Sequence, residues 1–468
     1  MSSLPQSSIR VRFAPSPTGH LHIGGLRTAL FNFLFARHNN GQFLLRIEDT
    51  DLERSRKEYT DAILEALRWT DITPDEPVVI QSERIKHHQK MINDLVERGK
   101  AYRCYCSIGL GASKETYMKY DGACRAQKFT FDVTGKPYVV RIKLPIEHQE
   151  AITFEDLIRG PITISLEQLD DFIIARSDGA PVYNFVVVVD DHDMEITHII
   201  RGEDHISNTP KQIVLYQAFG WQPPQFAHLP LIMGASGGRL SKRDAATSVL
   251  DYQTNGYLPE ALCNYLARLG WSHGNQEIFT RQELIELFSI KGIGKSAAVF
   301  DPEKLDSING IYMRAADNEL LLAYIVQYIQ KDLFDRVPWT KQQLVVLIGL
   351  YKERASTLRA LVDEIILLAQ GPLPLTDVDR AQYITPKTAL VLSQFIDEIK
   401  ASAIFDAQHV QSICKQLAKE ADVKMPEIAQ PIRLALLGKT QSPGVFDLLS
   451  VLGKETSIKR IQEFASSL

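Results

Sequence analysis

The chain has 468 residues, of which 45% are hydrophobic and 23% are charged, and its net charge is −5 at pH 7. This composition is typical of a folded globular protein and excludes disordered and fibrous chains. The length predicts about three domains or more. No apolar run approaches the ~18 residues of a membrane-spanning helix, and residues 1–8 lack the pattern of a secretory signal. We therefore expect a cytoplasmic protein without membrane contact. Any nucleic-acid binding must come from local basic surfaces, since bulk charge supplies no attraction.

The first 100 residues alternate strand and helix patterns. Residues 9–13 and 43–47 are alternating or β-branched and predict strands, whereas periodic apolar positions predict helices over 21–37 and 58–69. The order strand, loop, helix, strand opens a βαβ unit. A parallel, doubly wound sheet is therefore favoured.

The pattern changes between residues 101 and 181. Short alternating runs among Gly, Asp and Pro predict a small α+β insertion in this segment. The sheet pattern then resumes, because the apolar run Val186–Val189 predicts a buried central strand. A further strand is expected over 196–200 and a helix over 209–219.

After Asp251 the strand patterns nearly vanish. Helical periodicity predicts helices over 260–269, 319–330, 342–370, 386–401 and 410–421. Pro and Gly near 371–375 and 443–444 indicate subdivisions. We expect the second half to be all-α.

The most informative motif lies between the first strand and the first helix. It reads Arg12-Phe-Ala-Pro-Ser-Pro-Thr-Gly-His-Leu-His-Ile-Gly-Gly25. Such a junction aims free backbone N–H groups and the positive end of a helix at an anion. Gly19, Gly24 and Gly25 would let a bulky ligand approach the backbone, and His20 and His22 can donate to phosphate oxygens. The alternative is a Pro/Gly turn with two surface histidines.

A second motif is a basic loop. It reads Gly237-Gly-Arg-Leu-Ser-Lys-Arg-Asp244 and carries three cations in five residues. A loop of this kind can close over a triphosphate and neutralise charge as it develops. The alternative is a solvated run of charge.

The two motifs resemble the HIGH and KMSKS signatures of class I aminoacyl-tRNA synthetases. They stand here as His22-Ile-Gly-Gly25 and Arg239-Leu-Ser-Lys-Arg243. Gly25 occupies the position of the class-wide His, and glutamyl enzymes commonly carry that Gly. Further runs similar to bacterial glutamyl-tRNA synthetases are Leu45–Asp51, Tyr183–Phe185, Val189–His192, Ile200–His205, Ser207–Gln212, Leu269–Gly274, Ala429–Ala435 and Ser442–Gly444. The resemblance extends over residues 9–461.

The resemblance implies an enzyme that attaches L-glutamate to the 3′ end of tRNA(Glu) through a glutamyl-adenylate, with ATP and Mg²⁺. Glutamate would reach the 2′-OH of the terminal adenosine, and related enzymes need bound tRNA before they activate the amino acid. No obligate protein partner is expected. The chemistry agrees with the motifs, because attack of a carboxylate on the α-phosphate of ATP needs alignment and cations rather than a covalent nucleophile.

The resemblance also implies which residues bind the small substrates. ATP contacts are expected from Pro15, Ser16, Pro17, Thr18, Gly19, His20, Leu21, His22, Ile23, Gly24, Gly25, Arg239, Leu240, Ser241, Lys242 and Arg243. The residues expected to act in catalysis are His22, Gly24, Gly25, Lys242 and Arg243. The glutamate pocket is expected to comprise Arg12, Ala14, Ser16, Glu48, Tyr183 and Arg201.

Charge explains the expected glutamate pocket. A partly buried γ-carboxylate must meet a fixed cation, and Arg offers a bidentate fork. The resemblance gives that role to Arg12 and Arg201, and it gives the α-ammonium to Glu48. A salt bridge from Arg201 to Glu203 or Asp204 is the alternative.

The acidic run that contains Glu48 permits a second interpretation. Glu48, Asp49 and Asp51 together could form a metal cluster, whereas an acidic turn at a helix N-terminus would explain most of the run.

Three cysteines crowd into a short segment. Cys104, Cys106 and Cys124 are suitable thiolate ligands for a structural Zn²⁺, which needs a fourth ligand. Ala126 stands where related sequences often have His, and Tyr120 could supply a phenolate, as in some relatives. Bound zinc and three reduced thiols both remain open.

In the helical half, Lys352, Arg354 and Arg359 lie near one predicted helix end. Such a patch suits phosphate or base-edge contacts with an unstacked loop of tRNA. A solvated helix face is equally common.

The expected fold is a Rossmann-like parallel-sheet α/β catalytic domain with an α+β insertion, followed by all-α anticodon-binding domains. The expected segments are the catalytic domain in two halves (1–100 and 182–250), the insertion for the acceptor end (101–181), a helical stem-contact domain (251–316) and two helical anticodon-binding subdomains (317–372 and 373–468). Three alternatives remain: a glutaminyl enzyme, a truncated paralogue that modifies a base, and a catalytically silent tRNA-binding paralogue. The first should carry a β-barrel anticodon region and the second should lack this region.

Overall fold

The computed structural model describes residues 8–51, 53–106, 120–126, 135–147, 149–234, 237–238 and 248–468. The chain divides into two compact units, each described by itself below. The first comprises Met1–Leu250 and Cys263–Asp301, and the second comprises Asp251–Leu262 and Pro302–Leu468. Among the described residues, none of the helices has the length and hydropathy needed to cross a membrane.

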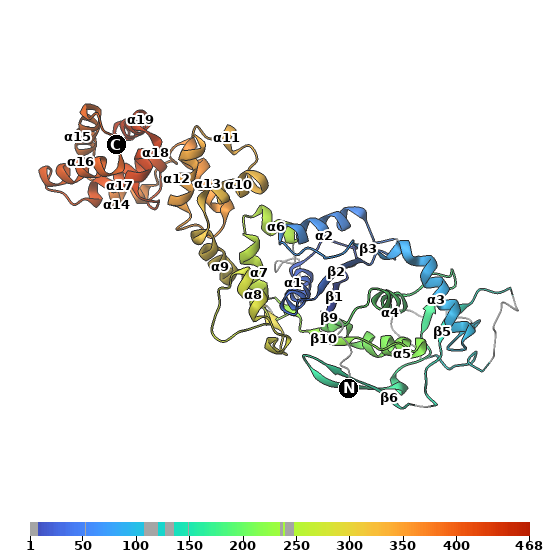
Figure 1. The fold of residues 1–468 in the computed structure, drawn as a ribbon. Helices are drawn as coiled ribbons and strands as arrows, with labels where there is room; N and C mark the ends of the chain where they lie inside the picture. The colour runs from blue at the N-terminus through green and yellow to red at the C-terminus, as the bar shows by residue number, and fades with distance from the viewer. Residues whose placement is uncertain are drawn as a thin grey trace. The chain divides into compact units, whose positions relative to one another are not determined.

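A set of parallel strands forms the centre of the first unit (Figure 1). One sheet has the order β1-β2-β3 and a second has the order β7-β6-β10-β9. The strands are β1 (Arg10–Phe13), β2 (Gln42–Ile47), β3 (Val79–Ile80), β6 (Ala151–Asp156), β7 (Gly160–Ser165), β9 (His198–Gly202) and β10 (Gln225–Leu229). The two sheets meet where the Thr197 N–H donates to the Arg10 carbonyl over 2.9 Å. All neighbours pair in parallel except the hairpin β6–β7. The expected parallel α/β fold is confirmed.

Helices cover both faces of these strands. On one face, Phe33 of α1 (Ile23–His38) packs edge-on against Phe43 of β2. On the other face, α4 (Tyr183–Asp193) and α5 (Thr209–Phe219) share a hydrophobic core with Leu44 of β2. The two faces follow from strand alternation, because Phe43 and Leu44 point to opposite sides.

One sequence prediction is wrong at α4. Val186–Val189 lie in the middle of this helix and do not form the expected strand. A short apolar run cannot be assigned by periodicity alone. Here the helix is enclosed between the strands and α5, so Val186–Val189 are at most 1% exposed and show no polar face.

The first unit contains further elements besides these and the small antiparallel sheet described below. They are α2 (Lys57–Trp69), the 3-10 turns η1 (Gln81–Arg84), η2 (Leu166–Gln168), η3 (Glu203–Asn208) and η4 (Ile290–Gly292), α3 (Ile85–Glu97), β11 (Ile232–Met233), α8 (Arg281–Leu287) and β12 (Ala298–Val299). The chain passes between the units within α6 (Val249–Thr254) and α7 (Pro259–Arg268).

The expected α+β insertion contains a small antiparallel sheet. Its order is β4-β5-β8, formed by β4 (Ala101–Cys104), β5 (Val139–Ile142) and β8 (Ile173–Ala175). The hairpin β6–β7 of the same segment extends the parallel strands instead, because Asp156 of β6 pairs with Phe226 of β10.

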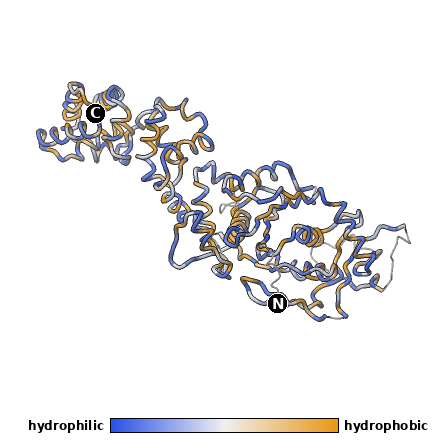
Figure 2. The backbone as a smooth tube through the Cα atoms, viewed as in Figure 1, coloured by the Kyte–Doolittle hydropathy of each residue, from blue (hydrophilic) through white to orange (hydrophobic). Residues whose placement is uncertain are grey.

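The second unit is helical, and residues 302–468, all of which the structure describes, contain no strand. The elements are α9 (Pro302–Ala315), α10 (Asn318–Tyr324), the π-helical turn η5 (Ile325–Ile329), α11 (Leu333–Arg336), α12 (Lys341–Tyr351), α13 (Leu358–Gln370), α14 (Asp377–Tyr383), α15 (Thr388–Ala401), α16 (Ala407–Glu420), α17 (Pro426–Leu437), α18 (Val445–Leu452) and α19 (Lys454–Ser466). Figure 2 shows hydrophobic stretches along the helices of this unit. The expected all-α region is confirmed.

The helix expected over 342–370 is interrupted in the structure. It consists of α12 and α13, and residues 352–357 separate them. Thr357 starts the second helix, because its side chain accepts a hydrogen bond from the Ala360 N–H and so satisfies a free N-terminal donor. The division into six segments with separate roles stays a prediction. Residues 251–316 are shared between the two units.

Candidate active site

A cavity of about 920 Å³ opens in the first unit at the carboxyl ends of β1, β2 and β9. Crevices at this edge of parallel sheets are the usual ligand sites of α/β folds. The structure brings these predicted residues into the wall of the cavity: Arg12, Ala14, Pro15, Ser16, Thr18, Gly19, His20, Leu21, His22, Gly24, Gly25, Glu48, Tyr183 and Arg201. Pro17 and Ile23 are buried and do not line it.

His22 forms the N-terminal cap of α1. Its Nδ1 accepts a hydrogen bond from the Gly25 N–H over 3.2 Å. Burial lowers the pKa of His22, which keeps the imidazole neutral. With Nδ1 as the acceptor, the ring proton resides on Nε2, which is then a donor for an anion in the cavity.

The two glycines of this motif are explained by packing. A Cβ at Gly24 would lie 3.1 Å from the His22 ring, and a Cβ at Gly25 would lie 2.7 Å from the Leu21 side chain. Glycine at these two positions therefore avoids contacts that would disturb the helix cap formed by His22. At Gly19 a Cβ would meet nothing within 4 Å, so crowding within the protein does not require glycine there.

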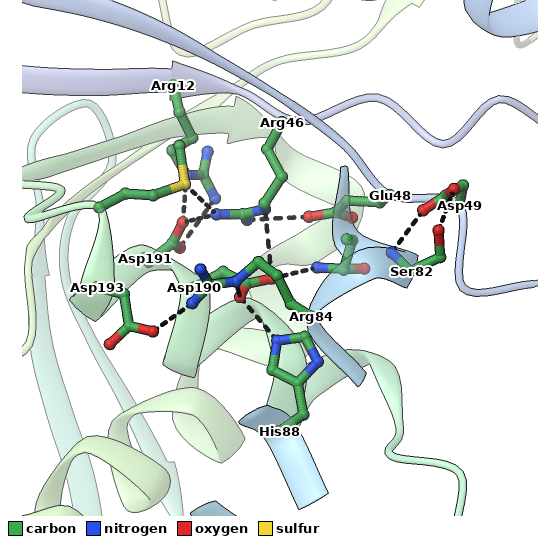
Figure 3. Close-up of polar contacts among 12 residues, drawn as sticks. Arg12, Arg46, Glu48, Asp49, Ser82, Arg84, His88, Asp190, Asp191 and Asp193 are labelled. Atoms are coloured by element: carbon green, nitrogen blue, oxygen red, sulfur yellow. Dashed lines mark hydrogen bonds and ion pairs between the residues drawn. The ribbon is translucent and has the colours of Figure 1, made fainter. Parts of the chain in front are cut away.

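Beneath the cavity, two arginines converge on one carboxylate (Figure 3). Arg12 donates from Nε and Nη2 to the two oxygens of Asp191, over 2.9 and 3.2 Å, and Arg46 donates from Nη1 over 2.6 Å. Burial alone would raise the pKa of Asp191, but the charges of Arg12 and Arg46 hold it below the ordinary value. Asp191 is therefore an anion.

Arg46 also holds Glu48 and faces a second aspartate. Its Nη2 donates to Glu48 Oε1 over 3.0 Å, and its Nε lies 4.0 Å from Asp190. Arg84 and His88 contact Asp190 as well, each over 2.7 Å. Burial raises the pKa of Glu48, although the Arg46 charge opposes this shift. The carboxylate at the cavity is thus fixed by a buried ion network.

Among the described residues, two arginines of the cavity wall keep a buried donor without a partner, Arg27 at Nε and Arg201 at Nη1. The other donors of Arg27 bind the Leu269 and Pro230 carbonyls. Arg201 Nη2 donates to Thr209 Oγ1 over 2.8 Å and its Nε to His228 Nε2 over 3.3 Å. Its Nη1 is buried and has no hydrogen-bond partner in the structure.

The alternative of a salt bridge from Arg201 to Glu203 or Asp204 finds no support among the described residues. Glu203 instead pairs with Arg159 and accepts from the Leu231 N–H.

Comparison with known proteins identifies the family. The model for the catalytic domain of class I tRNA synthetases (E and Q) matches residues 8–307, and a model for an anticodon binding domain matches residues 319–465. A glutamate–tRNA ligase of Geotalea uraniireducens is 44% identical over 98% of each chain, and one of Geobacter sulfurreducens is 43% identical over 99% of each. The chain is a class I tRNA synthetase of the glutamate–tRNA ligase family. The resemblance expected from the motifs is confirmed.

Solved structures agree with this assignment. A glutamate tRNA ligase from Elizabethkingia meningosepticum, in complex with its amino acid, superposes with a TM-score of 0.88 at 32% identity. The match covers 99% of this chain and all of that one.

Sequence reasoning missed the ion network that this synthetase places behind its cavity. Arg46 is a charged residue within a buried apolar strand, and Asp190 and Asp191 directly follow the apolar run of α4. These positions could have predicted the ion network, because a charged side chain inside a buried apolar element must be paired. His205 was also missed. It lines the cavity, its Nδ1 lies 3.1 Å from the Tyr183 hydroxyl, and burial lowers its pKa to about 4.

The carboxylates of the 48–51 run point to different partners. Glu48 pairs with Arg46, Asp49 accepts from Ser82, and Asp51 pairs with Arg54. Among the described residues, the one group of three or more such side chains that could hold a metal lies in the small antiparallel sheet region, and it is the cysteine cluster.

The cysteine cluster of the synthetase converges on one point. The sulfurs of Cys104, Cys106 and Cys124 lie within 4.8 Å of one another. The Tyr120 hydroxyl lies 3.4 Å from Cys104 Sγ and 3.9 Å from Cys106 Sγ. Burial raises the pKa of Cys106 to about 11. Three thiolates at this spacing need a cation to ionise together, and this donor set fits a tetrahedral Zn²⁺.

The remaining predicted residues divide into two groups. Arg239, Leu240, Ser241, Lys242 and Arg243 lie outside the described residues. In the second unit, Lys352 donates to the Ala316 carbonyl over 2.7 Å, and Arg359 donates to the Ile329 carbonyl over 2.9 Å. Arg354 is exposed. Two of the three cations therefore hold the helical unit together.

Proposed function

We propose that this chain attaches L-glutamate to tRNA(Glu) through a glutamyl-adenylate. In the first step, an α-carboxylate oxygen of glutamate attacks the α-phosphorus of ATP and pyrophosphate leaves. In the second, the 2′-OH of the terminal adenosine attacks the glutamyl carbonyl and AMP leaves. The relatives are named glutamate–tRNA ligases, which supports glutamate and tRNA as the substrates. The choice of glutamate as the amino acid rests on the unpartnered, buried Nη1 of Arg201.

Arg201 supplies the charge for the γ-carboxylate. A buried donor without a partner costs free energy until a ligand satisfies it. Arg201, whose Nη1 is buried without a partner, lines a cavity of a size that suits an amino acid and a nucleotide. Arg12 adds positive charge at the same wall, although Asp191 already accepts two of its hydrogen bonds. Arg201 is therefore the leading partner of the γ-carboxylate.

The backbone of glutamate is placed by the other wall. Glu48 accepts the α-ammonium with one oxygen while Arg46 holds the other. Tyr183 lines the cavity beside Arg201 and packs against the ligand.

ATP binds at the first motif. Its phosphates accept from His22 Nε2 and from the free N–H groups at the start of α1, where the helix dipole favours negative charge. Lys242 and Arg243 neutralise the charge that develops on the leaving pyrophosphate. Mg²⁺ arrives as the ATP complex, because the described residues of the cavity wall offer only the carboxylates of Glu48 and Asp204, and Mg²⁺ prefers substrate phosphates to such sparse protein ligands.

Glutamate is favoured over glutamine by charge. A neutral amide leaves the Arg201 guanidinium uncompensated in a buried place. The helical second unit also favours a glutamyl enzyme over a glutaminyl enzyme, since the latter should have a β-barrel in the anticodon region.

The other sites follow the same assignment. A structural Zn²⁺ would be held by Cys104, Cys106, Cys124 and the Tyr120 oxygen, where it would fix the fold and take no part in the reaction. The segment 101–181 would hold the acceptor end. In the second unit, Arg354 is the best candidate for tRNA contact among the three expected cations, because its side chain is exposed.

The test is Arg201→Ala in tRNA-dependent ATP–pyrophosphate exchange with glutamate and with glutamine. Loss of a buried charge partner costs about 3–5 kcal/mol. We therefore expect kcat/KM for glutamate to fall by about two to four orders of magnitude, while the preference over glutamine collapses. Arg10→Ala is the matched control, since Arg10 lies on β1 but pairs with Glu76 away from the cavity. An unchanged preference in Arg201→Ala would reject this role.

A further inference from the structure

Three neighbouring parallel strands place an aspartate, a histidine and an arginine in a row. Phe226 of β10 is in register with Asp156 of β6, and His228, two residues on, is in register with Arg201 of β9. Residues two apart on a strand share a face. Asp156, His228 and Arg201 are 1%, 0% and 6% exposed, so the row is buried and only Arg201 among the three lines the cavity.

The row has a defined direction of hydrogen bonding. His228 Nδ1 lies 2.6 Å from Asp156 Oδ2. Burial alone would raise the pKa of Asp156, but the hydrogen bond from His228 and backbone donors hold it below the ordinary value. An ionised carboxylate only accepts, so Nδ1 carries the proton. Burial lowers the pKa of His228, so the ring is neutral and Nε2 presents a lone pair.

That lone pair faces Arg201, which lines the cavity. His228 Nε2 lies 3.3 Å from Arg201 Nε and 3.1 Å from Thr209 Oγ1. Arg201 Nη2 donates to the same Thr209 oxygen over 2.8 Å. One edge of the guanidinium is therefore fixed by two acceptors, and the opposite nitrogen, Nη1, keeps its free donors.

We propose that Asp156 and His228 are positioning residues for glutamate recognition. Asp156 fixes the tautomer of the His228 ring, and His228 in turn holds the Arg201 guanidinium so that Nη1 is available to the substrate. This inference rests on the proposed role of Arg201. It also gives Asp156, which comes from the segment expected to bind the acceptor end, a role in the amino-acid pocket.

Asp156→Asn separates this role from simple packing. Asp156 Oδ1 accepts from the Ile158 N–H over 3.0 Å and from the Arg159 N–H over 2.9 Å. Oδ2 accepts from the backbone N–H of His228 over 3.1 Å in addition to facing Nδ1. An amide that keeps its oxygen at Ile158 and Arg159 turns its NH₂ group toward His228. The imidazole must then accept at Nδ1 and carry its proton on Nε2. Two donors would face each other at Arg201 Nε, and the guanidinium would be displaced.

The expected result is a selective defect. We expect KM for glutamate in tRNA-dependent ATP–pyrophosphate exchange to rise about 10- to 100-fold, the scale of a lost hydrogen bond to a buried charged group, with KM for ATP near the wild-type value. The ¹⁵N shifts of His228 should show the exchange of tautomer. Asp171→Asn is the control, because Asp171 is a buried carboxylate of the same segment that accepts from Tyr102 and Arg125 instead.

A second variant distinguishes a defect caused by the wrong His228 tautomer from one caused by a loss of protein stability. His228→Gln supplies an amide oxygen as the acceptor for Arg201 whatever residue stands at 156. The double variant Asp156→Asn/His228→Gln should therefore have a glutamate KM closer to wild type than Asp156→Asn alone. Additive damage in the double variant, or an unchanged tautomer and glutamate KM in Asp156→Asn, would overturn the proposal.

The proposed glutamate pocket and the proposed positioning role would be rejected by different results. If Arg201→Ala leaves glutamate activation normal, the proposed pocket itself is wrong. If Arg201→Ala abolishes glutamate activation but Asp156→Asn has normal kinetics, the pocket stands and the positioning role falls.

Discussion

Arg46 donates a hydrogen bond to Asp191 over 2.6 Å, and both side chains are fully buried. The same guanidinium holds Glu48 over 3.0 Å. One arginine that does not line the cavity thus ties the carboxylate expected to bind the α-ammonium to the aspartate that anchors Arg12. Truncation of Arg46 removes one partner from several buried anions at once.

We expect Arg46→Met to lower the free energy of unfolding by about 3–5 kcal/mol, the usual cost of breaking a buried pair. KM for glutamate should rise as well, because an unpaired Glu48 is protonated more easily. Urea unfolding and ATP–pyrophosphate exchange measure the two effects. Arg54→Met is the control, since its pair with Asp51 is exposed and is worth about 0–1 kcal/mol. Equal destabilisation by both variants would contradict the network.

Five histidines of the first unit predict a pH dependence of stability. Burial lowers their pKa values from 6.5, for His205 to about 4, and the five are His22, His192, His198, His205 and His228. Between these values the unfolded chain binds protons that the native protein does not, so stability falls as pH drops below about 6.5. Glu48, whose pKa burial raises, has the opposite effect as a single group. Urea midpoints at pH 7.5, 6 and 5 should decline, and His205→Gln should flatten the decline. A midpoint that rises on acidification would exclude this explanation.

Zinc analysis tests the cysteine cluster. Protein purified without chelator should contain about one zinc per chain, and Cys104→Ser should lose it, because the cluster then keeps two thiolates. Cys263→Ser is the matched control, since Cys263 is buried outside the cluster. Glutamate selectivity should be unchanged in both variants. A metal-free preparation with full activity would show that the three thiols are simply reduced.

Of the basic residues after α12, Arg354 should affect tRNA binding and Arg359 should affect stability. Arg354→Ala should weaken tRNA binding by a few-fold with an unchanged melting temperature, because its side chain is exposed. Arg359→Ala should lower the free energy of unfolding by about 1–3 kcal/mol, since Arg359 donates to the Ile329 and Thr254 carbonyls. Filter binding and thermal unfolding distinguish the two. If Arg354→Ala lowers the melting temperature and leaves tRNA binding intact, the assignment is reversed.

The sequence predicted the elements whose signals are local. The helix expected over 209–219 has these bounds in α5, since Asn208, Pro210 and Gly220 mark its ends. The strand expected over 186–189 is a helix because enclosure by neighbouring elements, which is a tertiary property, removes its polar face. The cavity wall followed from motifs, whereas Asp156 and His228 could not be found, because their role depends on the register of three strands far apart in the chain.

Aminoacylation of purified tRNA(Glu) and tRNA(Gln) with labelled glutamate or glutamine, in the presence of ATP and Mg²⁺, tests the central claim most directly. We expect acid-precipitable glutamate on tRNA(Glu) and none from glutamine on either tRNA, because only a γ-carboxylate compensates the positive charge of Arg201. Transfer of glutamine in preference to glutamate, or no transfer by a preparation that binds tRNA(Glu), would contradict the account.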